Sequence, residues 1–178
     1  MTDDPESMHL EIAVSVHDAA WLDALGDLEQ QARRAVSAVL RHLDVGVAPL
    51  EISLVFTDDS EQRGLNRDYR HKDSATNVLS FPNMDDADMT APEGSPRLLG
   101  DVVLARETIA REAGEQNKSL ADHTTHLLVH GTLHLLGYDH MKAAEAAEME
   151  AVETEILAGL GIADPYAGDV AAAEARHG

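Results

Sequence analysis

Alternation of apolar and polar residues along the chain predicts four β-strands. Over residues 9–16, Leu, Ile and Val occupy every second position, which is typical of a strand with one buried face. Short apolar runs bounded by Pro, Gly or Asp predict the other three strands. The expected strands are His9–Val16, Leu50–Phe56, Thr76–Phe81 (ended by Pro82) and Leu98–Ala105.

Apolar residues recur at helical spacing in most of the intervening stretches and after the last strand. Gly46 and Pro49 close the first helical region, and Asp58 or Asp59 is a suitable N-cap for the second. The expected helices are Trp21–Leu43, Asp59 to about Arg67, Arg106–Gly114, Leu120–Leu136 and Lys142–Leu160.

The order of these elements predicts an α+β fold. A small mixed four-stranded sheet is expected to pack with about five helices, mainly on one side. Asn83–Arg97 shows no apolar period and is expected to be a loop, and the alanine-rich Ala167–Gly178 a frayed tail. The 178 residues suffice for one domain with a core but not for two, so a single domain over residues 1–166 is expected.

The chain contains no cysteine, which limits its chemistry. A disulfide framework and a thiolate metal site are both excluded, so His, Asp and Glu remain as possible metal ligands. No apolar run approaches the roughly 18 residues of a membrane helix. The first seven residues are acidic and polar, unlike a secretory signal, so a cytoplasmic location is expected.

The formal net charge is −20, so the surface should on average repel nucleic acid. The basic residues are unevenly distributed, however. Four of the thirteen fall within ten positions, namely Arg63, Arg67, Arg70 and Lys72. We therefore expect a local basic patch on an acidic body. The surplus carboxylates are expected on solvated helix faces, where they keep the protein soluble.

Five of the ten histidines fall between His123 and His140. His126, His130 and His134 are four residues apart and share one face of the predicted helix. The outer two are separated by about 12 Å along the helix axis, so they cannot both lie about 2.0–2.1 Å from one zinc ion. The helix can therefore supply two ligands, and the third must follow a reversal of the chain.

Gly137 provides that reversal, because glycine commonly ends a helix with positive φ, and the chain then reaches His140. The predicted zinc ligands are His130, His134 and His140. Three imidazoles leave one position open, as in catalytic zinc centres. The alternative, ordinary core or surface histidines, does not account for three of them at this spacing around a glycine. His126 is assigned to packing or to a contact behind the ligands.

The same spacing matches the metzincin protease pattern HExxHxxGxxH, in which the glutamate acts as general base. Here the glutamate position is Gly131, which cannot transfer a proton. Asp139 is the nearest carboxylate in the sequence, and nothing further supports it as a replacement. The pattern therefore argues against a peptidase.

The segment HGTLHLLGYDH at residues 130–140 resembles the signature of the YbeY family, bacterial metal-dependent endoribonucleases of ribosome maturation. Further segments extend the resemblance over about residues 50–166. They are LNRDYR at 65–70, TNVLSFP at 76–82, LGD at 99–101, MEAVE at 149–153 and DPY at 164–166. One departure is His71, because the resemblance predicts a glycine after Arg70.

The resemblance implies an α+β fold, one zinc ion on the three histidines, and hydrolysis of single-stranded RNA in the maturation and quality control of small-subunit ribosomal RNA. It also implies that Arg70 is the basic catalytic or RNA-contacting residue, and arginine is well suited to clamp a phosphate. The weaker candidates for contacts to the RNA backbone are Arg63, Arg67 and Lys72. The expected partners are ribosomal RNA, the small ribosomal subunit and its assembly factors, with no role on DNA or at a membrane.

Two other hypotheses remain open at the level of sequence. One is a metal-dependent hydrolase of another substrate, such as a peptide or a small phosphoester. The other is a metal-stabilised ribosome-assembly factor that binds without cutting. The role of Asp101 is also open, because it either orients the site or ends a strand turn.

Overall fold

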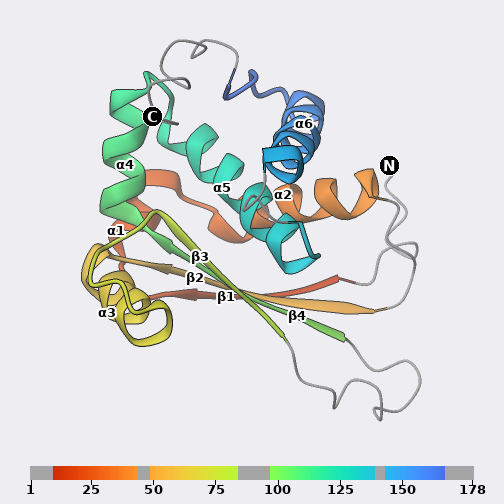
Figure 1. Cartoon of the computed structure of the whole chain (residues 1–178). Helices are drawn as coiled ribbons and strands as arrows, with labels where there is room; N and C mark the ends of the chain where they lie inside the picture. Colours follow the sequence, from red (N-terminus) through yellow and green to blue (C-terminus); the bar gives the residue numbers. More distant parts are fainter. Residues whose placement is uncertain (1–9, 44–48, 84–96, 139–142, 167–178) are drawn as a thin grey trace.

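The computed structural model describes residues 10–43, 49–83, 97–138 and 143–166. Four strands form one mixed sheet in the order β1-β2-β4-β3 (Figure 1). The strands are β1 (Leu10–Val16), β2 (Leu50–Thr57), β3 (Val78–Pro82) and β4 (Arg97–Ala105). β1, β2 and β4 are parallel, whereas β3 pairs antiparallel with β4 at one edge. All four expected strands are therefore present, with small shifts at their ends.

The described residues form six helices. They are α1 (Ala20–Leu25), α2 (Leu28–His42), α3 (Asp59–Arg70), α4 (Arg106–Glu115), α5 (Leu120–Leu135) and α6 (Ala143–Gly159). Three of them begin at a side-chain N-cap: Asp27, Asp58 and Ser119 each accept a hydrogen bond from the backbone N–H three residues on. None of the described helices is both long and apolar enough to cross a membrane.

The prediction of one continuous helix over Trp21–Leu43 is wrong. The chain turns at Gly26, whose φ of 77° favours glycine, and Asp27 then caps the start of α2. Trp21 and Leu28 are both buried, so the apolar spacing continues across the break and does not reveal it. Helix α3 extends three residues beyond its expected end, to Arg70. Most of the expected loop Asn83–Arg97 and all of the expected tail lie outside the described residues.

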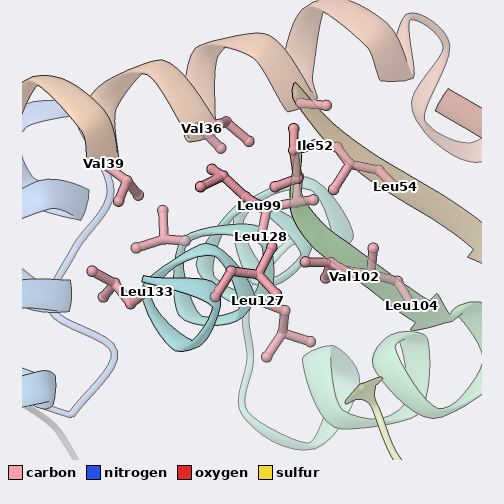
Figure 2. Close-up of a cluster of buried hydrophobic side chains, with 14 of the residues drawn as sticks. Val36, Val39, Ile52, Leu54, Leu99, Val102, Leu104, Leu127, Leu128 and Leu133 are labelled. Carbon is pink, nitrogen blue, oxygen red and sulfur yellow. The ribbon is translucent and has the colours of Figure 1, made fainter. Parts of the chain in front are cut away.

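The core lies between one face of the sheet and helices α2 and α5. Alternate residues of β2 are buried, as expected for a strand covered on one side. Figure 2 shows Val36 and Val39 of α2 together with Ile52 of β2, Val102 of β4 and Leu128 of α5. In Figure 1, α2, α5 and α6 lie on the same side of the sheet, which agrees with the expected one-sided cover.

Helix α5 packs directly against β3 and β4, and Gly131 makes this close approach possible. A Cβ atom at Gly131 would lie 2.7 Å from Cγ1 of Val102 and 3.2 Å from Oγ of Ser80. The Ser80 hydroxyl donates a 3.3 Å hydrogen bond to the backbone oxygen of Gly131. The contact fixes the height of α5 above the sheet and so places His130, the preceding residue, beside strand β3.

Candidate functional site

His130 and His134 lie one turn apart near the C-terminal end of α5, with their ring planes at an angle of 77°. Their Nε2 atoms are 3.1 Å apart and their ring centroids 4.6 Å apart. Both residues are partly exposed, whereas His123 and His126 in the same helix are buried. The helix therefore brings the same nitrogen of two imidazoles to one point at the surface.

The separation of these nitrogens fits two ligands of one zinc ion. In a tetrahedral site, nitrogens about 2.0–2.1 Å from zinc lie about 3.3–3.4 Å from each other. The third predicted ligand, His140, falls outside the described residues. Within the described residues, no three His, Asp or Glu side chains are close enough to hold a metal ion. The complete zinc site stays a prediction, and the described pair supplies two suitable nitrogens for it.

A buried carboxylate lies behind the histidine pair. Glu153 of α6 is fully buried and accepts hydrogen bonds from Nδ1 of His130 and from the hydroxyl of Tyr166. Its Oε1 also lies 3.5 Å from Nε2 of His126. We call these four residues the Glu153 network. His126, expected to serve in packing or behind the predicted ligands, contacts the carboxylate that His130 also contacts.

The charge of the Glu153 network favours a cation nearby. Burial would raise the pKa of the Glu153 carboxyl, but hydrogen bonds from His126 and His130 outweigh burial and hold that pKa well below its usual range. Burial also lowers the pKa of His126, which disfavours the charged form of this imidazole. Among the described residues, no lysine or arginine pairs with Glu153. A metal ion on the far side of His130 would balance this buried negative charge.

A cavity of about 660 Å³ opens beside the two histidines. Its walls come from the end of α3, the segment between α3 and β3, strand β3 and the end of α5. Within the described residues the lining includes two basic side chains, Arg70 and Lys72, and no acidic one. The chain as a whole carries a net charge of −20. The cavity is therefore a local basic site on an acidic protein, suited to an anionic ligand.

Arg70 is held in place by strand β3. Its Nη2 donates a 3.0 Å hydrogen bond to the backbone oxygen of Ser80, and its Cζ lies 5.8 Å from the centre of the Phe81 ring. No carboxylate pairs with Arg70 in the described part of the chain. One edge of the guanidinium is thus anchored, and the remaining N–H groups are available to a phosphate.

The other predicted backbone-contacting residues differ in position. Lys72 lines the cavity together with Arg70. Arg63 instead pairs with Asp73 through two contacts of 2.7 and 3.2 Å, and Arg67 pairs with Asp68 at 3.3 Å. Neither Arg63 nor Arg67 is among the residues that line the cavity. Of the four basic residues between positions 63 and 72, Arg70 and Lys72 therefore line the cavity, whereas Arg63 and Arg67 form ion pairs at the surface.

The departure at His71 has a backbone explanation. His71 follows the last residue of α3 and adopts a left-handed conformation, with φ 61° and ψ 31°. Glycine adopts this conformation without a steric penalty, whereas histidine does so at some cost. The chain therefore makes a left-handed turn after Arg70 with a residue less suited to it than glycine, and the Ser80 contact fixes the guanidinium.

Two further carboxylates of the sequence analysis are not part of the described cavity. Asp101 is exposed on β4, where it lies opposite Phe81 of β3, and it does not line the cavity. Asp139 falls outside the described residues.

Sequence reasoning assigned no role to Glu153, Tyr166 or Ser80. Glu153 and Tyr166 lie in the short segments MEAVE and DPY, which carry part of the family resemblance, but no spacing connects them to the histidines. Ser80 lies in a strand whose apolar pattern predicts structure only. Its backbone oxygen becomes functional through a contact with Arg70, ten residues away in the sequence.

Comparison with known proteins gives consistent matches. The family model described as Endoribonuclease YbeY matches residues 16–161. Endoribonuclease YbeY of Paramagnetospirillum magneticum is 54% identical over 157 residues, covering 88% of this chain and 96% of its own length. The proteins of the same name from Dinoroseobacter shibae and Agrobacterium fabrum are 51% and 50% identical, covering 92% and 89% of this chain and 93% and 96% of theirs.

A solved structure also resembles this one. The solution structure of TM1509 from Thermotoga maritima matches 88% of this chain and 90% of its own, with a TM-score of 0.54 and 20% sequence identity. At this identity the likeness supports the fold alone, and it agrees with the single-domain mixed sheet and helices described above.

Proposed function

Because the chain belongs to the YbeY endoribonuclease family, we propose that it is a zinc-dependent endoribonuclease that hydrolyses single-stranded RNA. The observation that carries the proposal is the meeting of two features at one cavity. The Nε2 atoms of His130 and His134 converge there at 3.1 Å, and Arg70 and Lys72 line the same cavity. Two suitable metal-binding nitrogens next to two basic side chains suit hydrolysis of a phosphodiester.

The zinc ion is proposed to be held by His130, His134 and His140. When bound, zinc would lower the pKa of a coordinated water toward about 7 and polarise a phosphoryl oxygen. The chain's own contribution begins with Glu153, which keeps the proton of His130 on Nδ1 and so directs the lone pair of Nε2 toward the metal.

Arg70 is proposed to bind the scissile phosphate. Its anchored guanidinium presents N–H groups in a fixed plane, which lets it stabilise negative charge that develops on the phosphoryl oxygens. Lys72 supplies a second, more mobile positive charge in the same cavity, suited to a neighbouring phosphate. Arg63 and Arg67 remain candidates for backbone contacts only if RNA displaces their carboxylate partners.

The proposed biological role is maturation and quality control of small-subunit ribosomal RNA, and it rests on the family. The charge of the chain bears on this role, because a body of net charge −20 with a small basic cavity should bind free RNA weakly. Contacts with the small ribosomal subunit and its assembly factors would then bring the substrate to the enzyme and provide its specificity.

The position of Gly131 argues against the peptidase alternative. In the protease pattern the general base follows the first histidine, but here a Cβ atom at that position would lie 2.7 Å from Cγ1 of Val102 and 3.2 Å from Oγ of Ser80, closer than van der Waals contact. A glutamate side chain has no room there and would point into the sheet rather than into the cavity.

The proposal is tested by metal analysis and RNA cleavage on the same preparations. Purified protein should contain about one zinc per chain, and alanine at His130, His134 or His140 should remove both zinc and cleavage of single-stranded RNA. His17→Ala is the matched control, because this exposed histidine pairs with Glu61 away from the cavity. Arg70→Ala should retain zinc but lose cleavage. Wild-type protein that holds zinc and binds RNA without cutting it would support the assembly-factor alternative instead.

A further inference from the structure

Tyr69 is unusual among the aromatic residues of this chain. The chain has six aromatic side chains, all within the described residues. Trp21 and Phe56 are completely buried in the core, whereas Tyr69 is 67% exposed and is the one aromatic residue among them that is largely open to solvent. Single exposed apolar side chains are common on protein surfaces, so the meaning of this ring depends on what lies beside it.

The Tyr69 ring packs against Phe81 and belongs to the residue that precedes Arg70, which lines the cavity. It packs edge-on against Phe81, with ring centroids 5.6 Å apart and an angle of 67° between the planes. The guanidinium of Arg70 also lies over the Phe81 ring. The neighbours of Phe81 in the strand, Ser80 and Pro82, line the cavity. Tyr69 does not line the cavity itself, but its ring and the guanidinium of Arg70, which does, both contact Phe81.

We propose that Tyr69 is a stacking surface for an unpaired base of the RNA strand whose phosphates lie at Arg70 and Lys72. This inference rests on the proposed function and adds the part of the site that recognises single strands. Sites for single-stranded nucleic acid combine cationic groups that follow the backbone with aromatic rings on which bases stack. Tyr69, Arg70 and Lys72 offer that combination within four consecutive residues.

The surroundings of Tyr69 favour a base over a protein partner. Residues 67–68 and 70–73 are all polar and exposed, so the ring is an isolated apolar surface and not part of an apolar patch. Within the described residues its hydroxyl has no hydrogen-bond partner. The ring face is thus the feature that the fold presents. Since every base has a π-face, the contact would require an unstacked base but would not select its identity.

The inference is tested with Tyr69→Leu, Tyr69→Phe and the control Leu22→Ala. Leu22 lies on α1 and is 48% exposed, the second exposed large apolar side chain within the described residues. Single-turnover cleavage of a short single-stranded RNA, measured against enzyme concentration, yields a half-saturating concentration and a maximal rate. Tyr69→Leu should raise the half-saturating concentration by roughly 5- to 100-fold with little change in maximal rate or zinc content. Tyr69→Phe and Leu22→Ala should behave as wild type.

A set of RNAs, each with one abasic position, separates stacking from a general effect. In wild type one abasic position should weaken binding by about the same factor as Tyr69→Leu, and in Tyr69→Leu that position should have no further effect. Additive losses, or a Tyr69→Leu variant that binds like wild type, would overturn the stacking role while leaving the endoribonuclease proposal intact. A wild-type protein that neither binds nor cleaves RNA would overturn both, and loss of binding in Tyr69→Phe would indicate a role for the hydroxyl instead.

Discussion

Nδ1 of His130 in α5 donates a hydrogen bond to Oε2 of Glu153 in α6, although the two residues are 23 positions apart in the sequence. Glu153 is completely buried, and hydrogen bonds from His126 and His130 hold the pKa of its carboxyl low against the effect of burial. Because the ionised carboxylate only accepts hydrogen bonds, it fixes the ring proton of His130 on Nδ1. The other ring nitrogen then faces His134 as a lone pair.

Glu153→Gln tests this relationship through metal affinity. Glutamine keeps the shape and one acceptor oxygen but removes the charge, so we expect zinc affinity to fall by about 10- to 100-fold. Competition with a chromophoric chelator measures the change directly. Glu155→Gln is the matched control on the same helix, because Glu155 is exposed and pairs with His42. If Glu153→Gln binds zinc as tightly as wild type does, Glu153 has no influence on the ligand.

The close approach at Gly131 should be evident in stability. Gly131→Ala would place a Cβ atom 2.7 Å from Val102, so the helix or the strand must shift, and we expect a loss of about 1–3 kcal/mol in the free energy of unfolding. Gly114→Ala in α4 is the control, because no heavy atom lies within 4 Å of its added Cβ. It should gain about 0.5–1 kcal/mol. Urea denaturation measures both, and equal effects would contradict the tight contact.

The parts of this molecule that local patterns govern could be predicted from sequence. Strand alternation places one face of each strand in the core. A spacing of four residues along α5 places His130 and His134 on the same helix face, one turn apart. The break at Gly26 could not be predicted from the apolar spacing, because Trp21 before it and Leu28 after it are both buried.

The parts that depend on contacts between distant segments could not be predicted. Helical spacing places Glu153 on the same face of α6 as the apolar Met149 and Ile156, but the sequence does not identify its partner, because that contact arises from the packing of α6 against α5. Likewise, four basic residues between positions 63 and 72 look equivalent in sequence. Their division into ion pairs and cavity residues depends on where Asp73 and strand β3 lie.

His71→Gly is expected to stabilise the protein. The left-handed backbone at this position costs a non-glycine residue about 1–2 kcal/mol, part of which glycine offsets through greater freedom in the unfolded state. We expect a net gain of about 0.5–1 kcal/mol in thermal or urea unfolding, with zinc content and RNA cleavage unchanged because Ser80 still holds Arg70. Asn117→Gly, at the other non-glycine residue with positive φ among those described, should gain less, because asparagine tolerates this conformation better. A destabilised His71→Gly would mean that the imidazole makes a contact worth more than the backbone cost.

The ion pair between Asp18 and Arg106 predicts an acid-dependent part of the stability. The hydrogen bond from Arg106, at 2.7 Å, and a second from the backbone N–H of Ala20 hold the pKa of Asp18 below its usual value. A depressed pKa stabilises the fold above the unfolded-state pKa of about 3.9, and the contribution is lost as pH falls below it. Asp18→Asn should therefore lose about 1 kcal/mol at pH 7 and progressively less as the pH falls toward the folded-state pKa of Asp18. Asp23→Asn on α1 should follow wild type over the same range, and a constant deficit in Asp18→Asn would point to packing instead.

The charge of the cavity predicts a shallow salt dependence for RNA binding. Binding to single strands weakens with salt at a slope of about −0.7 per neutralised phosphate in a double-logarithmic plot. Sequence alone, with four basic residues between positions 63 and 72, allows two to four contacts, hence a slope of roughly −1.5 to −3. In the structure Arg63 and Arg67 already pair with carboxylates, which leaves Arg70 and Lys72 in the cavity.

We therefore expect the shallow end of that range, about −1.4 for two contacts. The measurement is a titration of a short single-stranded RNA with the inactive His134→Ala variant at several salt concentrations. Adding Lys72→Ala should reduce the slope to about −0.7, because it removes one of the two cavity cations. Adding Arg63→Ala should leave the slope unchanged, because Asp73 already neutralises that side chain. A slope far steeper than −3, or equal losses for Lys72→Ala and Arg63→Ala, would place the RNA on a basic surface other than this cavity.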